Sequence, residues 1–316
     1  MRIPGYGLRA LSRLWFCGVL LAAASQCWAA PDAISSLDSW RKATVKIECG
    51  YPTVKGASTP LAKTEPVGTG VIFWAPGLAP NDFLLVSAKH VFDAISTNVI
   101  ALRFSWYYAD PAGVHKETTA FLKSGVNDYV TSLDGADLAC LAITLRPEDI
   151  GAAAVPAIRL SELAAPSDIY MGASVLALGY PDVAGSGWDT AIMRQGIIAS
   201  LAPRDQTTSP FLVDANIYPG NSGGPVFKAP IGMDRTGKPS AKLRAAFLGI
   251  VIRRGQRKED VYAGQNVYSV PTAAGPQTAQ ALVGDAIGFV EPATRVRQLL
   301  LKAAAWAKAA RGSARP

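Results

Sequence analysis

One stretch of the chain, residues 218–225 with the sequence Y-P-G-N-S-G-G-P, places a serine in a setting suited to nucleophilic chemistry. Its two prolines lack backbone donors and its three glycines permit backbone angles that other residues avoid, so the stretch is predicted to form a loop. Such a loop can hold the hydroxyl of Ser222 outward and leave neighbouring N–H groups free. Acyl transfer requires this combination, because it needs a nucleophile and donors for the developing oxyanion.

A serine nucleophile needs a general base, which is usually histidine. The chain has two histidines, His90 and His115, and both precede Ser222. Residues 220–224 also match the Gly-x-Ser-x-Gly pattern of α/β-hydrolases, but those enzymes place their histidine after the serine. The order that remains is histidine, acid, serine.

His90 is the better candidate for the base, because it follows the apolar run 83–88 at the point where a strand would end in a turn of small residues. The alternative for His90 is a buried core histidine. His115 lies in a polar stretch with proline and glycine, residues 110–117, which is typical of a solvated turn.

Two aspartates are candidates for the acid. Asp137 heads the apolar run 138–143, where a buried carboxylate would need a partner. Asp134 precedes a glycine and has the features of a turn residue, which makes it the weaker candidate.

Taken together, these motifs resemble those of the trypsin/chymotrypsin-like serine endopeptidases, in particular the bacterial Deg/HtrA type. The most specific match is residues 213–225, and the similarity runs from about residue 45 to the C-terminal helix. The other similar segments, in chain order, are residues 68–72, 87–91, 137–139, 178–181 and 288–292.

The resemblance implies an all-β fold of two antiparallel six-stranded β-barrels with a C-terminal α-helix. It implies cleavage of polypeptides through an acyl-enzyme, with Ser222 as nucleophile and His90 as general base and then general acid. Asp137 would orient His90. The backbone N–H groups of Gly220 and Ser222 would form the oxyanion hole.

The pattern of the whole chain agrees with an all-β fold, because short apolar runs are repeatedly broken by Gly, Pro and Asp. Residues 30–150 are predicted to form the N-terminal barrel with His90 and Asp137. A linker follows at 151–166, and the C-terminal barrel with Ser222 spans 167–292. A helix and tail are expected at 293–316, with the strongest helical periodicity at 294–310 on an apolar face of Val296, Leu299, Leu300, Ala303 and Trp306.

Two polar stretches, residues 50–67 and 253–284, are predicted to be surface loops. The long second one is either functional or a tolerated insertion.

The N-terminus has the features of a secretory signal peptide. Three arginines precede the apolar run 14–24, and small residues follow at 27–30, so cleavage is expected after Ala29 or Ala30. The apolar run is short for a membrane-spanning helix, and an uncleaved anchor is the less favoured alternative. We therefore expect a secreted or periplasmic protein with no stable membrane anchor after removal of residues 1–29.

Charge and cysteine content narrow the classes of partner. Residues 1–29 contain three of the 31 basic residues and none of the 24 acidic ones, so the remaining positive charge is mild. The sequence has no stripe of basic residues interleaved with aromatic residues, so nucleic-acid binding is not predicted. Cys49 and Cys140 remain after cleavage, either as a disulfide or as two buried thiols. Neither they nor the two distant histidines have zinc-site spacing, and no cofactor is predicted.

Specificity is predicted from the family's pocket positions. Asn216, six residues before Ser222, stands at the pocket base, so an acidic base for Lys or Arg is missing. Ile250, Val251 and Ile252 would line the pocket with apolar groups and favour a small or medium aliphatic residue. The following pair, Arg253 and Arg254, would instead favour acidic residues nearby.

Two departures from better-known relatives affect what the resemblance implies. Asn221 stands where the digestive-type enzymes have the aspartate that pairs with a new N-terminal amine, so this zymogen step is not expected. A PDZ domain, common in Deg-type enzymes, is not expected after the helix. The alternatives to an endopeptidase are a binding or chaperone protein of the same fold with little turnover, and an esterase-like hydrolase using the same triad.

Overall fold

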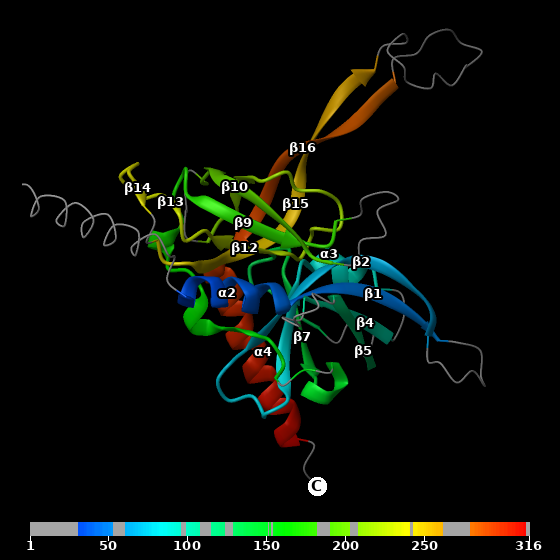
Figure 1. Cartoon of the computed structure of the whole chain (residues 1–316). Helices are drawn as coiled ribbons and strands as arrows, with labels where there is room; N and C mark the ends of the chain where they lie inside the picture. Colours follow the sequence, from blue (N-terminus) through cyan, green and yellow to red (C-terminus); the bar gives the residue numbers. More distant parts are fainter. Residues whose placement is uncertain are drawn as a thin grey trace, which may run out of the picture.

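The computed structural model gives the arrangement of most of the chain after residue 30 (Figure 1). The predicted signal peptide lies outside the described residues. No helix in the described part is both long and apolar enough to cross a membrane. The described ranges are 31–52, 61–95, 99–107, 115–123, 129–150, 152, 154–181, 190–202, 208–240, 243–261 and 279–313.

The N-terminal half is an antiparallel sheet that follows helix α2 (Pro31–Lys42). Its strands run in the order β5-β4-β1-β2-β3-β7-β6, and β8 joins β2 in parallel. The predicted six-stranded N-terminal barrel is therefore not what the described residues show, because no pairing among them joins the edge strands β5 and β6. The strands are β1 (Thr44–Pro52), β2 (Leu61–Trp74), β3 (Asp82–Ser87), β4 (Val99–Tyr107), β5 (His115–Lys123), β6 (Tyr129–Thr131), β7 (Ala139–Thr144) and β8 (Ile158–Arg159).

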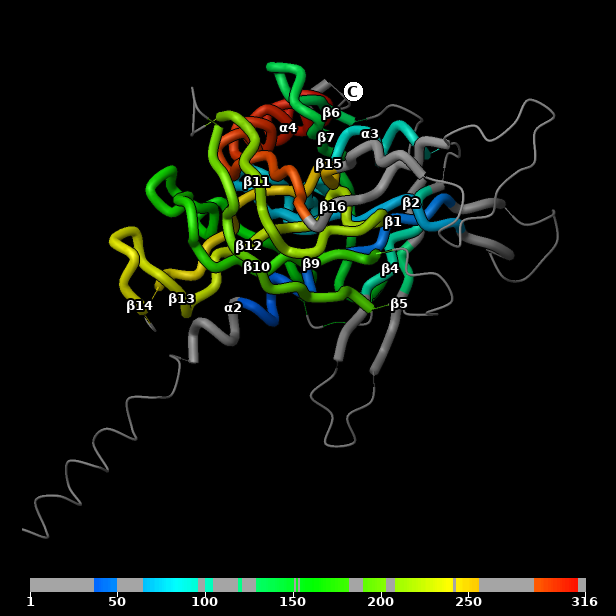
Figure 2. Tube along the Cα trace, turned by 90° about the horizontal axis from the view of Figure 1, so that it is seen from above, coloured from blue at the N-terminus to red at the C-terminus, as the bar shows by residue number. Residues whose placement is uncertain are grey.

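The C-terminal half is a closed six-stranded barrel in the order β10-β11-β16-β15-β12-β9, which confirms the barrel predicted there. Figure 2 shows it from above, with the small hairpin β13–β14 at one side. Short 3-10 helices lie at Pro147–Ile150, Leu160–Glu162 and Pro166–Asp168. The strands are β9 (Ser174–Gly179), β10 (Ile192–Ser200), β11 (Phe211–Asp214), β12 (Pro225–Lys228), β13 (Gly232–Met233), β14 (Pro239–Ser240), β15 (Ala246–Val261) and β16 (Ala279–Pro292).

Strands β15 and β16 continue beyond the barrel as a long hairpin (Figure 1). Their pairing extends from Gly249↔Pro292 to Val261↔Ala279. The prediction of a loop over residues 253–284 is therefore wrong for both arms of this hairpin. Likewise, β1 and β2 extend into the predicted loop 50–67. In both places the backbone ladder satisfies its own donors and acceptors, so a strand forms without an apolar side-chain pattern.

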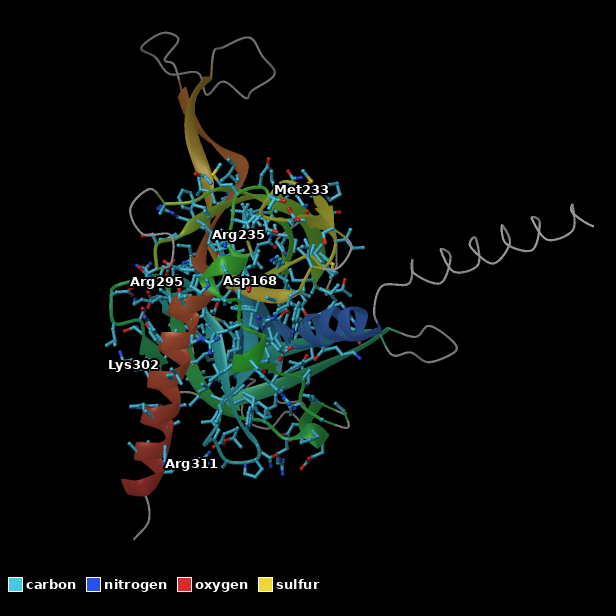
Figure 3. All side chains as sticks on the ribbon, turned by 90° about the vertical axis from the view of Figure 1, so that its left-hand side faces the viewer. Asp168, Met233, Arg235, Arg295, Lys302 and Arg311 are labelled. Atoms are coloured by element: carbon cyan, nitrogen blue, oxygen red, sulfur yellow. The ribbon has the colours of Figure 1, made fainter. Side chains whose placement is uncertain are left out.

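Helix α4 (Ala293–Ser313) follows the last barrel strand directly and packs on the N-terminal sheet. Figure 3 shows Arg295, Lys302 and Arg311 spaced along it. Lys302 Nζ donates to the carbonyl of Thr131, and Arg311 pairs with Asp82. The helix therefore joins the end of the C-terminal barrel to the N-terminal half. Of its predicted apolar face, only Trp306 is largely exposed, at 47%, and Val296, Leu299, Leu300 and Ala303 are buried.

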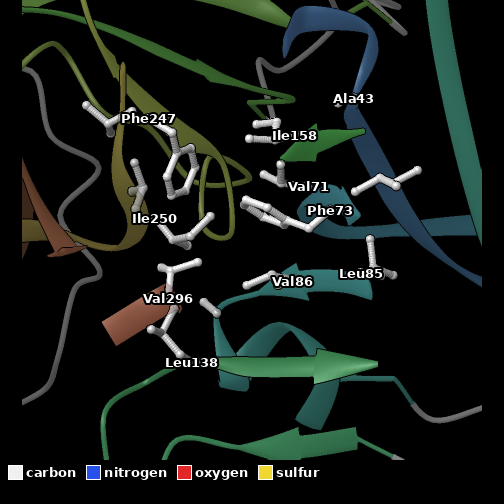
Figure 4. Close-up of a cluster of buried hydrophobic side chains, with 14 of the residues drawn as sticks. Ala43, Val71, Phe73, Leu85, Val86, Leu138, Ile158, Phe247, Ile250 and Val296 are labelled. Atoms are coloured by element: carbon white, nitrogen blue, oxygen red, sulfur yellow. The ribbon is translucent and has the colours of Figure 1, made fainter. Parts of the chain in front are cut away.

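One hydrophobic core spans both halves (Figure 4). Phe73 of β2 packs edge-on against Phe247 of β15, with ring centroids 5.2 Å apart. Trp40 of α2 stacks on Phe227 of β12 at 4.4 Å, and its Nε1 donates to Glu162 Oε1 at 2.5 Å. Aromatic side chains from one half thus fill space in the other, and this holds the sheet and the barrel in a fixed relation.

We predict that Trp40→Ala lowers the free energy of unfolding by about 3–5 kcal/mol, because it leaves a cavity beside Phe227 and removes a buried side chain that is 2% exposed. Urea unfolding monitored by circular dichroism measures this. Trp306→Ala, which removes the same side chain from a largely exposed position, serves as the control and should cost much less. Equal losses in the two variants would contradict the role given to Trp40.

Candidate active site

His90 and Asp137 lie side by side because β3 pairs with β7. The register Ser87↔Ala139 brings together the residues that follow β3 and precede β7. His90 sits in the short helix α3 (Lys89–Asp93), and its Nδ1 is 2.7 Å from Asp137 Oδ2. The backbone N–H of His90 donates to Asp137 Oδ1 at 3.0 Å. Both carboxylate oxygens of Asp137 therefore accept hydrogen bonds from His90, and Nε2 of the imidazole is not used in this contact.

The Asp137 carboxylate is stabilised in its charged form. Burial raises the pKa of Asp137, but the hydrogen bonds from the His90 side chain and backbone outweigh it and hold this pKa below its usual value. A carboxylate that stays charged near neutral pH can fix the imidazole tautomer and stabilise an imidazolium.

The two weaker candidates from the sequence lie elsewhere. His115 is the first residue of β5, paired with Tyr107, rather than part of a turn. Asp134 accepts hydrogen bonds from the hydroxyl of Ser132 at 2.5 Å and from the N–H of Ala136. Asp134 Oδ2 also forms an ion pair with Arg295, at 2.8 Å from Nε. The geometry of this contact is not that of a hydrogen bond, and Nε has no other hydrogen-bond partner among the described residues.

Arg295 links the loop before Asp137 to the C-terminal half. Its Nη1 donates to Glu291 Oε2 at 2.7 Å, while its Nε faces Asp134. Burial raises the pKa of Glu291, the Arg295 guanidinium counteracts this, and the nearby carboxylates Asp134 and Asp137 raise it further. Sequence reasoning did not identify this group, although the spacing of Glu291 and Arg295, four residues apart at the start of a helix, is a recognisable signal.

The Ser222 loop is attached to the N-terminal sheet through Thr69, which is fully buried in β2. The backbone N–H of Thr69 donates to the carbonyl of Ser222 at 2.9 Å, and its hydroxyl donates to the carbonyl of Gly220 at 2.7 Å. The same hydroxyl accepts a hydrogen bond from the N–H of Tyr180. One residue, through its side chain and its backbone, therefore fixes two residues of the loop that comes from the other half of the molecule.

Within the loop, the backbone donors divide into two groups. Asn221 N–H donates to Tyr218, Gly224 N–H to Asn221, and Gly223 N–H to Val251 at 2.7 Å. By contrast, the N–H groups of Gly220 and Ser222 donate no hydrogen bond to any residue that the structure describes. Gly220 has a φ of 86°, a conformation that glycine adopts readily. The two unused donors are those predicted for an oxyanion hole.

Gly68 shows how near the His90 and Ser222 segments come to each other. A Cβ atom placed on this glycine would lie 2.8 Å from a methyl group of Val91, the residue after His90. It would also lie 3.1 Å from the carbonyl oxygen of Ser222. The helix with His90 and the loop with Ser222 therefore approach the same glycine, and any larger residue there would push them apart.

The predicted pocket residues differ in their surroundings. Ile250 and Val251 have no exposed surface and pack into the core, so they do not face solvent as pocket-lining residues would. Ile252 is also buried. Asn216 is exposed and has a φ of 51°, the left-handed conformation, which asparagine tolerates better than most residues.

Cys49 and Cys140 are both free and buried, which matches the thiol alternative. Their strands, β1 and β7, are separated in the sheet by β2 and β3, so the disulfide alternative is not formed. Burial raises the pKa of the Cys140 thiol far above its usual value and makes it unreactive. Within the described ranges, no cluster of His, Cys, Asp and Glu side chains is arranged to hold a metal ion.

Residues 68–231 match the sequence model of the trypsin-like peptidase domain. This is more than half of the chain, and it includes His90, Asp137 and Ser222. The chain therefore belongs to the trypsin-like peptidase family and is a serine peptidase.

Solved structures with a similar fold include an HtrA-type protease, AlgW, with a decapeptide, at a TM-score of 0.45 and 20% identity, covering 85% of this chain and 67% of that one. The same protease with a tripeptide gives a TM-score of 0.44 and 20% identity, with coverage of 86% and 63%. The chain thus spans about two thirds of the length of these proteins. No protein of curated function matches its sequence.

The lowered pKa of Asp137 predicts how its contribution to stability depends on pH. Because the folded pKa lies below the unfolded value of about 3.9, the contribution is present above that pH and is lost as the pH falls through the folded pKa. The difference in melting temperature between the wild type and Asp137→Asn should therefore be constant from pH 7 to 5 and should narrow below about pH 4. A difference that widens on acidification would contradict the assigned shift.

Proposed function

We propose that this protein is an endopeptidase in which Ser222 attacks the peptide bond, His90 transfers the proton and Asp137 orients His90. The observation that carries the proposal is the pair of hydrogen bonds from His90 to Asp137, in a chain of the trypsin-like peptidase family. The attachment of the Ser222 loop to Thr69 supports it, because this loop and helix α3 both approach Gly68.

The chemical steps follow from these groups. With Nδ1 engaged by Asp137, the neutral imidazole presents Nε2 as the acceptor for the Ser222 proton as the hydroxyl attacks the carbonyl carbon. The imidazolium then protonates the leaving amine, which completes the acyl-enzyme. In the second half, water attacks the acyl carbon as His90 takes its proton. The bond from that carbon to Ser222 Oγ then breaks, the carboxylic acid product leaves, and the imidazolium returns a proton to Ser222.

The free N–H groups of Gly220 and Ser222 are proposed to bind the carbonyl oxygen when it becomes negative. Asn221, Gly223 and Gly224 use their N–H groups within the protein and are unavailable for this. One such donor in an acyl-transfer enzyme is worth roughly 10²–10³ in turnover. The loop thus divides its donors between holding its own shape and binding the substrate.

We also propose that the protein acts outside the cytoplasm, after loss of residues 1–29. The support for this is the sequence pattern of three arginines, an apolar run and small residues. The polypeptide substrate would then be an exported or extracellular protein.

Ser222→Ala should abolish both peptide cleavage and labelling by a fluorophosphonate, with an unchanged circular dichroism spectrum. His90→Ala should lose nearly all activity, and Asp137→Asn should lose about 10⁴-fold in turnover, because the tautomer of His90 is no longer fixed. The measurements are kcat on a quenched peptide substrate and the extent of labelling.

His115→Ala and Asp134→Asn are the matched controls. The first removes the other histidine, and the second removes a carboxylate three residues from Asp137. If either control is as damaging as its counterpart, the assigned base or acid is wrong. Cleavage of casein compared with a p-nitrophenyl ester separates a peptidase from an esterase, and a correctly folded protein that neither labels nor cleaves would instead be a binding protein.

Activity should not require a particular N-terminal residue. Asn221 is 3% exposed, and its Oδ1 has no hydrogen-bond partner in the described part of the chain. Because its side chain is a neutral amide, it cannot form an ion pair with an N-terminal amine. A Gly-Ser tag placed before Ala30 should change kcat/KM less than about threefold, far below the loss of one oxyanion donor. A tagged form that is inactive until trimmed would show that a terminal amine orders the site.

A further inference from the structure

We infer that the enzyme selects polypeptides with an acidic residue near the scissile bond, through three arginines on β10 and β15, Arg194, Arg253 and Arg254, which are together called the arginine cluster. This inference rests on the proposed function and names its substrate class. Arg194 lies against Tyr218 of the Ser222 loop, and Arg253 and Arg254 follow Val251, which is hydrogen-bonded to that loop.

Arg194 is the central member. In β10, Ile197 pairs with Asp214 at the end of β11, and the strands are antiparallel. Arg194 therefore lies level with the residues just after Asp214. Its guanidinium carbon is 4.3 Å from the ring centroid of Tyr218, which is 43% exposed and four residues before Ser222. A positive charge is thus fixed beside the nucleophile loop.

The guanidinium of Arg194 lacks the partners that a partly buried charge normally has. Its Nε is buried and makes no hydrogen bond, and no ion pair joins Arg194 to a carboxylate in the described part of the chain. An uncompensated polar group of this kind is costly and needs an explanation. Nε itself is enclosed, so a carboxylate supplied by the substrate would meet the two terminal nitrogens, whose planar fork matches a carboxylate in two hydrogen bonds.

Arg253 and Arg254 add charge of the same sign from β15. They follow Val251, whose backbone is hydrogen-bonded to both Gly223 and Gly224 after the serine. The guanidinium of Arg253 lies 4.2 Å over the ring of Phe289, and Arg254 is opposite Gly288 in the ladder.

Gly288 connects this side of the cluster to the nucleophile loop. A Cβ on Gly288 would lie 2.5 Å from Ile217, the neighbour of Tyr218. Arg254 is therefore on the face of β15 that lies toward this segment, whereas Arg253, the preceding residue of the strand, points to the opposite face with Phe289. Among the described residues, no carboxylate forms an ion pair with Arg253 or Arg254 either, so the charge of the cluster is not neutralised within the protein.

The test uses the full chain and a quenched peptide built on a cleavage site first mapped in casein. Glu, Gln and Leu are placed in turn at each of the positions flanking the scissile bond. Glu and Gln have nearly the same size, so their ratio of kcat/KM isolates the charge. We expect Glu to exceed Gln by about tenfold or more at one or more positions, the size of a charge-assisted hydrogen bond.

Arg194→Gln should bring this ratio to within about threefold of one. The double variant Arg253→Gln/Arg254→Gln should lower it less, because Arg253 is exposed and points to the opposite face of β15 from Arg254. Arg235→Gln is the matched control: its guanidinium also lies over a tyrosine ring, that of Tyr170, but in the β13–β14 hairpin away from α3 (Figures 1 and 2). It should leave the ratio unchanged. If Arg194→Gln does not fold, Arg194→Lys keeps the charge without the fork and should lower the ratio in part.

The outcomes separate the two proposals. A wild type that labels at Ser222 and cleaves peptides, but with a Glu-to-Gln ratio near one at every position, overturns the acidic preference and leaves the endopeptidase standing. A preference that survives all the cluster variants overturns the assignment to these arginines. A wild type without labelling or cleavage overturns the proposed function, and the inference with it.

Discussion

The arrangement around Ser222 depends on one buried residue, Thr69. Its hydroxyl both donates to Gly220 and accepts from Tyr180, and its backbone N–H donates to Ser222. Its carbonyl accepts a hydrogen bond from the hydroxyl of Ser87 at 2.7 Å. A buried donor or acceptor left without its partner costs about 1–3 kcal/mol, so these bonds form together or not at all. The serine loop can therefore reach its position only when the N-terminal sheet is correctly placed, and folding of the two halves is coupled to assembly of the site.

Close backbone approach makes this attachment possible. A Cβ on Gly223, which has a φ of 85°, would lie 1.9 Å from the carbonyl oxygen of Thr69. A Cβ on Gly179 would lie 2.7 Å from Oδ1 of Asn221. Gly223 is thus required by space as well as by conformation, and Gly179, the last residue of β9, leaves room for the Asn221 side chain. The α4 helix adds a second connection, because Arg295 links the loop before Asp137 to the end of β16.

The sequence predicted secondary structure best where burial in the core determines both the apolar side-chain pattern and the strand. The apolar runs 83–88 and 138–143 coincide closely with the strands β3 and β7, because these runs supply buried side chains to the core. The arms of the β15–β16 hairpin were missed, since ladder hydrogen bonds need no apolar pattern. The closure of the N-terminal sheet came only from resemblance, and the described pairing does not show it. His90 and Asp137 were identified from local context, but the contact of Arg295 with Asp134 depends on tertiary packing that no local pattern encodes.

The charges near the site are distributed unequally between its two sides. On the side of His90, three carboxylates lie close together, and Arg295 neutralises two of them while His90 engages Asp137. On the side of Ser222, Arg194 lies against Tyr218 and pairs with no carboxylate in the described structure, and Arg253 and Arg254 add positive charge on β15. Because the interaction between partly buried charges is screened less than at the surface, this asymmetry persists at physiological ionic strength. Negative charge beside the base stabilises the imidazolium during proton transfer, whereas positive charge beside the serine favours an electron-rich partner. The proposed base and the proposed acidic substrate would thus meet opposite charges, and the loop held by Thr69 lies between them.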